Sequence, residues 1–214
     1  MVDTPRAEAR NATPAILDYL HRVHVPRDAG LARAFAVPDG IPAIQVSPAD
    51  GRLLGLLLTL VRASKVVEVG TLIGYSAIHM ARALAPGGHL WTIEYDPRHA
   101  ELARGNLAAA GVADRVTVLV GAGREILPTL DGEAPFDAVF IDADKVSYDH
   151  YGRWAVDHLR PGGLVLGDNA YLFGELLADT DRGRAMRGFH EVVAAHCDSV
   201  CASTPEGLVV GIKR

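Results

Sequence analysis

Two acidic motifs in the chain combine side chains that bind hard metal ions. Asp142 and the pair Asp168-Asn169 each come directly after a short apolar run. Carboxylates that lie side by side repel each other unless a proton or a cation neutralises them. A set of oxygen ligands favours Mg²⁺, with Mn²⁺ or Ca²⁺ as alternatives, over Zn²⁺. If the two apolar runs are neighbouring strands, we expect Asp142, Asp168 and Asn169 to hold one divalent cation.

Each of these residues also has a simpler interpretation. An Asp after a strand is often a helix cap, and Asp168-Asn169 is a common turn pair. Lys145 is of a type that usually lies solvated at the surface. It follows Asp142 by three positions, however, and a neighbouring dication disfavours the ammonium form of a lysine. Lys145 is therefore a candidate proton acceptor.

A glycine-containing segment, Glu68–Ser76, offers a second site. Gly70 permits a sharp turn beneath a ligand, and Gly74 permits a helix to start close to a sheet. The N–H groups at that helix start, together with the Ser76 hydroxyl, are suited to a carboxylate or a phosphate. Taken alone, the segment is also typical of a tight strand-to-helix turn.

Glu94 indicates which ligand this segment would bind. It lies twenty residues beyond Gly74, where an open α/β sheet places a carboxylate for ribose hydroxyls. A dinucleotide such as NAD requires a G-x-G-x-x-G loop, and the spacing here departs from it. S-adenosylmethionine (SAM) has no pyrophosphate and needs a ribose carboxylate and a place for its amino-acid end. Glu68, Gly70, Ser76 and Glu94 supply these groups, so the sequence favours SAM.

These residues need a framework that brings them to one edge. From Lys65 onward, short apolar runs alternate with longer amphipathic ones, which is typical of βαβ units and a parallel sheet. The expected strands are Lys65–Val69, His89–Glu94, Val116–Val120, Ala138–Ile141 and Leu164–Leu166. The expected helices between them are Tyr75–Ala83, Pro97–Ala110, Arg124–Leu130 and Ser147–His158, with a turn at Pro161–Gly163.

Outside this alternation, short local motifs predict the remaining helices and strands. Ser47 can cap a helix over Pro48–Ala63. Further expected elements are helices over Pro14–His24 and Ala185–Ala195 and a hairpin of Ser199–Thr204 with Leu208–Ile212. We predict that residues 41–214 form a single cofactor-binding domain, with residues 1–40 as a helical or irregular segment packed on it.

The composition excludes several classes of protein. The chain has 214 residues and a net charge of −5 without a basic run, so a nucleic-acid partner is not expected. The longest apolar stretch, Leu53–Val61, is too short to span a bilayer, and Met1–Asn11 has no apolar signal core. Cys197 and Cys201 are too few for a disulfide framework or a thiolate zinc site. We expect a soluble, cytoplasmic protein without a membrane partner.

Several motifs occur together in the order found in a known family. They are Val46–Gly51, Glu68–Thr71, Gly74–Ser76, Thr92–Glu94, Phe140–Lys145 with Tyr148, and Pro161–Gly163 through Asp168-Asn169. From about Ile44 to the C-terminus, the chain resembles the cation-dependent class I O-methyltransferases, which include catechol and caffeoyl-CoA O-methyltransferases. The resemblance implies a Rossmann-like α/β fold, in which helices cover both faces of a seven-stranded, mostly parallel sheet with an antiparallel C-terminal strand. It also implies a homodimer.

The resemblance further implies a role for each site residue. Asp142, Asp168 and Asn169 correspond to metal ligands, Lys145 to the general base, and Glu94 to the residue that binds the cofactor ribose. Positions around the methionine end of SAM are Glu68, Gly70, Thr71 and Ser76, and further cofactor contacts are Val46, Asp144 and Gly123, the last beneath the adenine.

Two positions depart from the family pattern. Phe173 stands where a small or polar residue often follows the metal-ligand motif, which argues against a bulky coenzyme A-linked acceptor. His190 stands where the family often has Asn. It is able to approach the metal or the substrate, although a surface histidine or an internally bonded one is the commoner case.

We therefore expect the chain to transfer the methyl group of SAM to a hydroxyl of a small catechol-like acceptor, with a divalent cation and a lysine base. The alternatives are a nicotinamide-dependent oxidoreductase on a similar sheet and a nucleoside-binding module without catalytic activity. Methylation of a nucleic-acid base is disfavoured, because Asp142–Lys145 stands where that class has an Asn/Asp-Pro-Pro-aromatic motif.

The choice of cofactor predicts a ligand-dependent shift in thermal unfolding. A ligand that binds only the folded chain raises the unfolding midpoint. S-adenosylhomocysteine (SAH), the demethylated form of SAM, should therefore raise the midpoint in a thermal-shift assay, whereas NAD at the same concentration should not. A rise with NAD alone would favour the oxidoreductase alternative.

Overall fold

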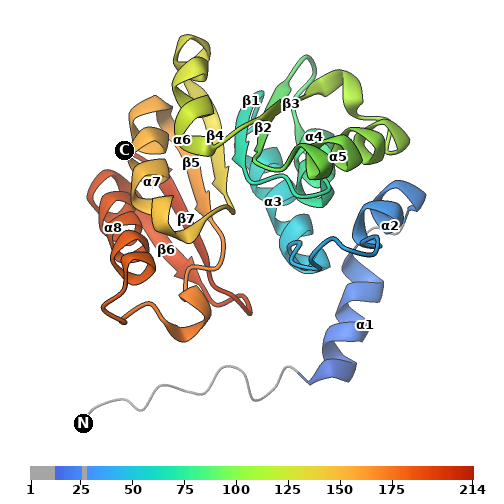
Figure 1. The fold of residues 1–214 in the computed structure, drawn as a ribbon, viewed down its shortest axis with the longest axis horizontal. Coiled ribbons are helices and arrows are strands. Elements are labelled where there is room, and N and C mark those ends of the chain that lie inside the picture. The colour runs from blue at the N-terminus through green and yellow to red at the C-terminus, as the bar shows by residue number, and fades with distance from the viewer. Residues whose placement is uncertain (1–12, 26–27) are drawn as a thin grey trace.

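The computed structural model of the chain describes residues 13–25 and 28–214. Seven strands form one sheet in the order β3-β2-β1-β4-β5-β7-β6 (Figure 1). They are β1 (Lys65–Val69), β2 (His89–Glu94), β3 (Val116–Val120), β4 (Phe136–Ile141), β5 (Leu159–Gly167), β6 (Cys197–Ala202) and β7 (Leu208–Lys213). β7 pairs antiparallel with β5 and β6, and the other pairs are parallel. The predicted α/β class with an antiparallel C-terminal strand is confirmed.

Helices cover both faces of this sheet (Figure 1). One face carries α3 (Pro48–Leu60), α4 (Tyr75–Ala83) and α5 (Pro97–Ala109), and the other carries α6 (Gly123–Ile126), α7 (Tyr148–His158) and α8 (Asp181–His196). Side chains along a strand point alternately to the two faces, so Val66 and Val67 of β1 belong to different apolar clusters. Strands covered on both faces must be apolar at nearly every position, which explains the uninterrupted apolar runs in the sequence.

The connectivity reverses beside β1. The chain runs outward from β1 to β2 and β3, and then crosses back to β4 on the other side of β1. At such a reversal the loops that follow neighbouring strands separate and leave a crevice at the carboxyl edge of the sheet. Gly70 follows β1 and Asp142 follows β4. The two predicted motifs therefore flank this crevice.

The predicted turn at Pro161–Gly163 is wrong, because this segment lies inside β5. The register between β4 and β5 shifts there: Leu159 pairs with Phe136, and Leu164 pairs with Ala138. Gly162 has a φ of 75°, a conformation that glycine adopts easily. The strand can therefore continue through the bulge instead of ending in a turn.

The predicted helices are present, with differences at their ends. α3 ends at Leu60 rather than Ala63, and α5 ends at Ala109. The predicted helix Arg124–Leu130 is divided into α6 and the 3₁₀ helix η3 (Leu127–Glu133). Pro128 lacks the N–H that a continuous α-helix requires, which accounts for the division.

The N-terminal elements lie at the edge of the molecule. α1 (Pro14–His24) has the predicted bounds, projects away from the sheet and has no buried residue (Figure 1). α2 (Ala29–Phe35) packs against α4 and α5. The domain boundary at residue 40 stays a prediction, and Met1–Asn11 lies outside the described residues. Within the described part of the chain, no helix is long and apolar enough to cross a membrane.

Asp137 links three strands at the amino edge of the sheet. Its Oδ2 accepts hydrogen bonds from the backbone N–H groups of Ser64 at 2.7 Å and Lys65 at 2.8 Å, where β1 begins. Its Oδ1 accepts a hydrogen bond from Nε of Arg160 in β5 at 2.6 Å. Burial opposes the charged carboxylate, but the hydrogen bonds outweigh it and lower the pKa of Asp137.

This anchor predicts a pH-dependent effect of Asp137→Asn. A carboxylate whose pKa is lowered by folding stabilises the protein above its unfolded pKa, and this contribution is lost as the pH falls through the folded pKa. We expect the substitution to lower the free energy of unfolding by about 2 kcal/mol at pH 7. In urea titrations, the difference from wild type should narrow below about pH 4. A difference that grows on acidification would contradict this role.

Candidate active site

A cavity of about 990 Å³ lies at the carboxyl edge of the sheet, where β1 and β4 end. This volume is typical of a site for a small ligand. Eleven of the twelve site residues predicted from the sequence line it, namely Val46, Gly70, Thr71, Ser76, Glu94, Gly123, Asp142, Asp144, Lys145, Asp168 and Asn169. The twelfth, Glu68, is fully buried. The fold thus brings the glycine segment and both acidic motifs to one cavity.

Gly70 lets the ends of β1 and β4 approach each other. Its φ of 97° lies in the left-handed region, and a Cβ at this position would overlap the carbonyl oxygen of Asp142. The Asp142 N–H donates to the Val69 carbonyl at 2.8 Å and holds the two strand ends together. A side chain at position 70 would therefore separate the glycine segment from the acidic motif.

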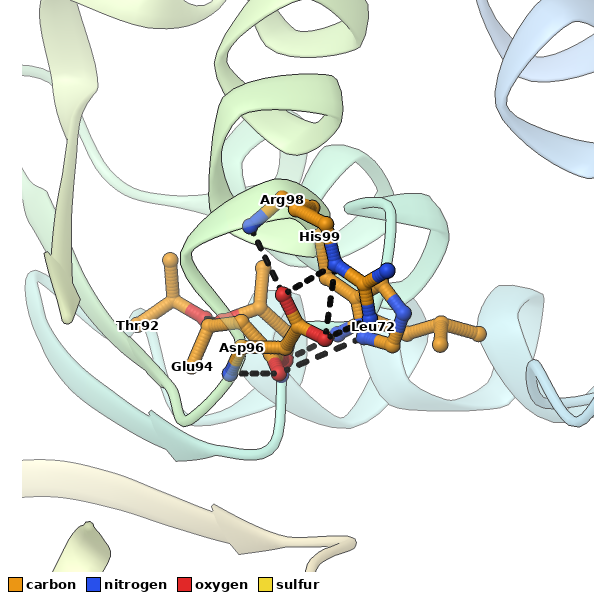
Figure 2. Close-up of polar contacts among 7 residues, drawn as sticks. Leu72, Thr92, Glu94, Asp96, Arg98 and His99 are labelled. Atoms are coloured by element: carbon orange, nitrogen blue, oxygen red, sulfur yellow. Dashed lines mark hydrogen bonds and ion pairs between the residues drawn. The ribbon is translucent and has the colours of Figure 1, made fainter. Parts of the chain in front are cut away.

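Glu94 fixes the glycine segment from the side of β2 (Figure 2). Its Oε2 accepts hydrogen bonds from the backbone N–H groups of Leu72 at 2.7 Å and Thr71 at 3.2 Å. Its Oε1 accepts one from the Asp96 N–H at 2.9 Å and lies 3.5 Å from Nδ1 of His99. The carboxylate lines the cavity where the ribose was expected, and it also holds the shape of the segment. Sequence reasoning missed His99, which lines the same wall.

Glu68 is a buried carboxylate that accepts hydrogen bonds from two hydroxyl groups. Ser76 donates to Oε1, and Thr92 donates to Oε2 at 2.5 Å. Burial raises the pKa of Glu68 to about 7, and these hydrogen bonds oppose the rise. Because the Ser76 proton is directed to Glu68, the Ser76 oxygen is left as an acceptor on the cavity side. The expectation that Ser76 and the N–H groups at the start of α4 bind a carboxylate or a phosphate stays a prediction.

The predicted cation ligands follow the adjacent strands β4 and β5. The Asp168 N–H donates to the Ile141 carbonyl at 3.0 Å, so the two strand ends stay paired up to Asp142 and Asp168. Burial and the negative charge of Asp142 raise the pKa of Asp168. Asn169 has a φ of 53°, a left-handed conformation that Asn tolerates better than most residues.

This set of donors suits a hard cation. Asp142 and Asp168 supply carboxylate oxygens and Asn169 supplies an amide oxygen, and a cation would relieve the repulsion between the two carboxylates. Among residues 13–25 and 28–214, no group of three or more His, Cys, Asp or Glu side chains has the arrangement of a metal site. The proposed cation site therefore depends on the side-chain amide of Asn169 for a third protein ligand. The bound cation stays a prediction.

Lys145 faces the acidic motif and is held there by Tyr148. Its Nζ donates to Oδ1 of Asp142 at 3.0 Å and to the Tyr148 hydroxyl at 2.9 Å. The Tyr148 hydroxyl lies 2.9 Å from the carbonyl oxygen of Asp168 and 3.1 Å from that of Ile141. Sequence reasoning assigned Tyr148 no role. Its position three residues after Lys145, about one helical turn, is the signal that predicts such a contact.

The segment after β3 forms another wall of the cavity. A Cβ at Gly123 would come within 2.8 Å of both the Tyr151 hydroxyl and Val69. Tyr151 is fixed in turn by donating to Oδ1 of Asp144 at 2.6 Å. The absence of a side chain at Gly123 therefore lets Tyr151 and Val69 pack against its backbone, and its predicted position beneath an adenine stays a prediction. Tyr151 is a further lining residue that sequence reasoning missed.

Large apolar side chains are exposed around the cavity. Phe173 is 59% exposed and Ile44 is 69% exposed, and both line the cavity. Phe173 has a φ of 53°, which is costly for a residue with a side chain and is often found at functional sites. Nε2 of His190 lies 3.0 Å from the Ala170 carbonyl oxygen. His190 is therefore internally bonded, the commoner of its two expected roles.

Comparison with known proteins relates this site to a family. A family model described as O-methyltransferase matches residues 30–196. A catechol O-methyltransferase of Niastella koreensis is 44% identical over 177 residues, which cover 82% of this chain and 80% of the relative. The solved O-methyltransferase of Bacillus cereus, in complex with SAH, superposes with a TM-score of 0.87 and 34% identity over 94% of this chain and 97% of the neighbour. The solved O-methyltransferase TomG of Streptomyces achromogenes, in complex with SAM, superposes with a TM-score of 0.86 and 37% identity over 93% of this chain and 96% of the neighbour.

Proposed function

The chain belongs to the O-methyltransferase family, and from this premise we propose that it transfers the methyl group of SAM to a hydroxyl of a small catechol-like acceptor. The observation that carries the proposal is the shared cavity, which the glycine segment and the acidic motifs line together. The similarity to a relative named catechol O-methyltransferase supports the choice of acceptor.

SAM would occupy the part of the cavity lined by the glycine segment, Glu94 and Gly123. When bound, it supplies an electrophilic methyl group on a positively charged sulfur. Glu94 offers carboxylate oxygens to the ribose hydroxyls, and Val46 and Asp144 contribute further contacts. Neighbours solved in complex with SAH and SAM support this proposal. The nicotinamide alternative has no comparable support.

Asp142, Asp168 and Asn169 would hold a divalent cation, with Mg²⁺ as the first choice. When bound, the cation supplies positive charge that lowers the pKa of a nearby acceptor hydroxyl. The two carboxylates by themselves would repel an acceptor oxygen that is losing its proton. The cation requirement therefore follows from the charge of the residues that face the acceptor.

Lys145 is the proposed general base. Its Nζ lies 3.0 Å from Oδ1 of Asp142, so a hydroxyl placed beside Asp142 is within its reach. In the neutral form, Nζ accepts the proton that the acceptor hydroxyl releases. The hydrogen bond to Tyr148 keeps this nitrogen at the acidic motif while the proton moves.

The remaining requirement is alignment of the acceptor oxygen with the methyl group. The attacking oxygen is negative and the sulfur is positive, so their charges cancel as the methyl moves. Much of the acceleration then comes from holding the two groups in line. The exposed apolar side chains of Phe173 and Ile44 suit a flat aromatic ring and favour this orientation.

We also propose that the chain forms a homodimer, as the family resemblance implies. The observation that supports this proposal is the surface of α1. Its apolar side chains Ile16, Leu17, Leu20 and Val23 are exposed, although their spacing places them along one side of the helix. A second copy of the chain would cover this surface.

The metal proposal predicts the behaviour of Asp142→Ala. The variant should lose at least about 100-fold in kcat, because it lacks a charged ligand of the cation. Its affinity for SAH should stay close to that of wild type, since the carbonyl of residue 142 that packs over Gly70 is retained. Turnover with and without Mg²⁺ and calorimetric titration with SAH measure the two effects.

Asp149→Ala is a matched control for this experiment. Asp149 forms an ion pair with Arg153 and does not line the cavity, so this variant should keep both turnover and SAH affinity. Full activity of Asp142→Ala in the presence of a chelator would refute the metal role.

The charge of the cavity bears on the choice of acceptor. Asp50 and Glu206 line it in addition to the proposed cation ligands. The lining carboxylates outnumber the cations that line the cavity, Arg124 and Lys145, and Lys145 is already paired with Asp142. An acceptor with a carboxylate or a phosphate would therefore meet like charge.

A panel of acceptors tests this electrostatic preference. We expect kcat/KM to be about fivefold higher for free catechol than for a catechol carboxylate, because a solvent-exposed charge contact is worth up to about 1 kcal/mol. A coenzyme A thioester should be poorer still. Glu206→Gln should narrow the difference, whereas Glu191→Gln, outside the cavity, should leave it unchanged. A preference of wild type for the carboxylate would contradict the prediction.

A further inference from the structure

His190 of α8 contacts the loop that carries two of the proposed cation ligands. The side chain does not line the cavity, and its Nε2 lies 3.0 Å from the carbonyl oxygen of Ala170. A carbonyl oxygen can only accept a hydrogen bond, so Nε2 must carry a proton and donate it. His190 therefore binds, from outside the cavity, the residue that directly follows Asn169.

Both backbone polar groups of Ala170 are held by other parts of the chain. Its N–H donates at 2.9 Å to the carbonyl of Gly207, in the connection between β6 and β7. Its carbonyl accepts from His190. Ala170 is fully buried, and a buried carbonyl that loses its donor is costly. The backbone on both sides of Ala170 is consequently fixed.

Asn169 has a backbone conformation that needs such support. Its φ of 53° lies in the left-handed region, which Asn adopts more readily than most residues but which still costs energy. A residue keeps such a conformation only where its surroundings enforce it. The direction of a side chain depends on the backbone conformation of its own residue. The fixed Ala170 therefore also controls where the Asn169 amide points.

The helix that carries His190 is packed firmly on the end of β5. Phe189 is fully buried, and a Cβ at Gly167, directly before Asp168, would overlap its ring. The same ring packs edge-on against Tyr148, with the ring centroids 5.4 Å apart, and α8 also lies against α7 (Figure 1). His190 thus donates its hydrogen bond from a rigid element.

We propose that His190 is a positioning residue for the cation site: by holding the Ala170 carbonyl, it keeps Asn169 in the left-handed conformation from which its amide oxygen serves as the third ligand. This inference rests on the proposed function, because the cation site is part of that proposal. His190 does not bind the cation itself and acts through the backbone of Ala170.

The test is the affinity of the full chain for Mn²⁺, measured by electron paramagnetic resonance of the free ion in the absence of cofactor and acceptor. His190→Ala should bind Mn²⁺ about tenfold more weakly than wild type, because one hydrogen bond that supports the ligand loop is lost. Its affinity for SAH in calorimetric titration should stay close to that of wild type, because the glycine segment and Glu94 are unchanged.

Two variants separate positioning from other roles of the imidazole. His190→Gln keeps a side-chain N–H that can donate to Ala170 and should restore most of the Mn²⁺ affinity. A loss in His190→Gln as large as that in His190→Ala would indicate a direct imidazole ligand and would overturn the positioning role. His196→Ala is the matched control, because His196 contacts the Val192 carbonyl on the same helix at 2.9 Å. It should leave the affinity unchanged.

A double variant tests whether His190 acts through Asn169. Asn169→Ala alone should weaken Mn²⁺ binding, and the addition of His190→Ala should weaken it no further, because the ligand that His190 positions is already absent. Independent, additive losses would overturn the inference. If His190→Ala does not fold in thermal unfolding, His190→Leu, which fills the same space without a donor, replaces it in both experiments.

The outcomes distinguish this inference from the proposed function. An unchanged Mn²⁺ affinity in His190→Ala would overturn the positioning role and leave the methyltransferase proposal intact. Failure of the wild-type chain to bind Mn²⁺ would instead overturn the cation part of the proposed function, and this inference with it.

Discussion

The close approach of β1 and β4 at their carboxyl ends is the constraint on which the rest of the site depends. The backbone at Asp142 passes over Gly70 at a distance that leaves no room for a Cβ. The glycine segment and the acidic motif consequently share one wall of the cavity. Glu94 holds the same segment from β2 through backbone N–H groups. Ligands bound to the two motifs are therefore kept in one cavity, as a transfer reaction requires.

Carboxylates gather in and directly beneath the cavity, where burial of charge is costly, and the protein stabilises each in a different way. Glu94 accepts from backbone N–H groups, Glu68 accepts from hydroxyls, and Asp142 pairs with the Lys145 ammonium group. Asp168, whose pKa is raised by burial, is the least compensated. The excess of negative charge is what a positively charged ligand relieves. A sulfonium cofactor and a hard cation both meet this requirement.

The sequence patterns were sufficient to predict the helices and strands and most of the residues that line the cavity. The bounds of β1, β2 and β3 agree with the prediction, because each is a short apolar run between polar or glycine residues. Parallel strands end at one edge, which made the convergence of their following residues predictable. The contact of Thr92 with Glu68 was not predictable, because it depends on sheet register, whereas the contact of Tyr148 with Lys145 follows from their three-residue spacing. The bulge at Gly162 was read as a turn, because glycine is compatible with both.

The most direct measurement is a crystal structure of the chain with SAH and Mn²⁺, in which anomalous scattering locates the metal. We expect SAH along the glycine segment with its ribose at Glu94, and an anomalous peak within coordination distance of Asp142, Asp168 and Asn169. An anomalous peak held by other residues, or SAH bound outside this cavity, would contradict the claim that one sheet edge unites the methyl donor and the cation.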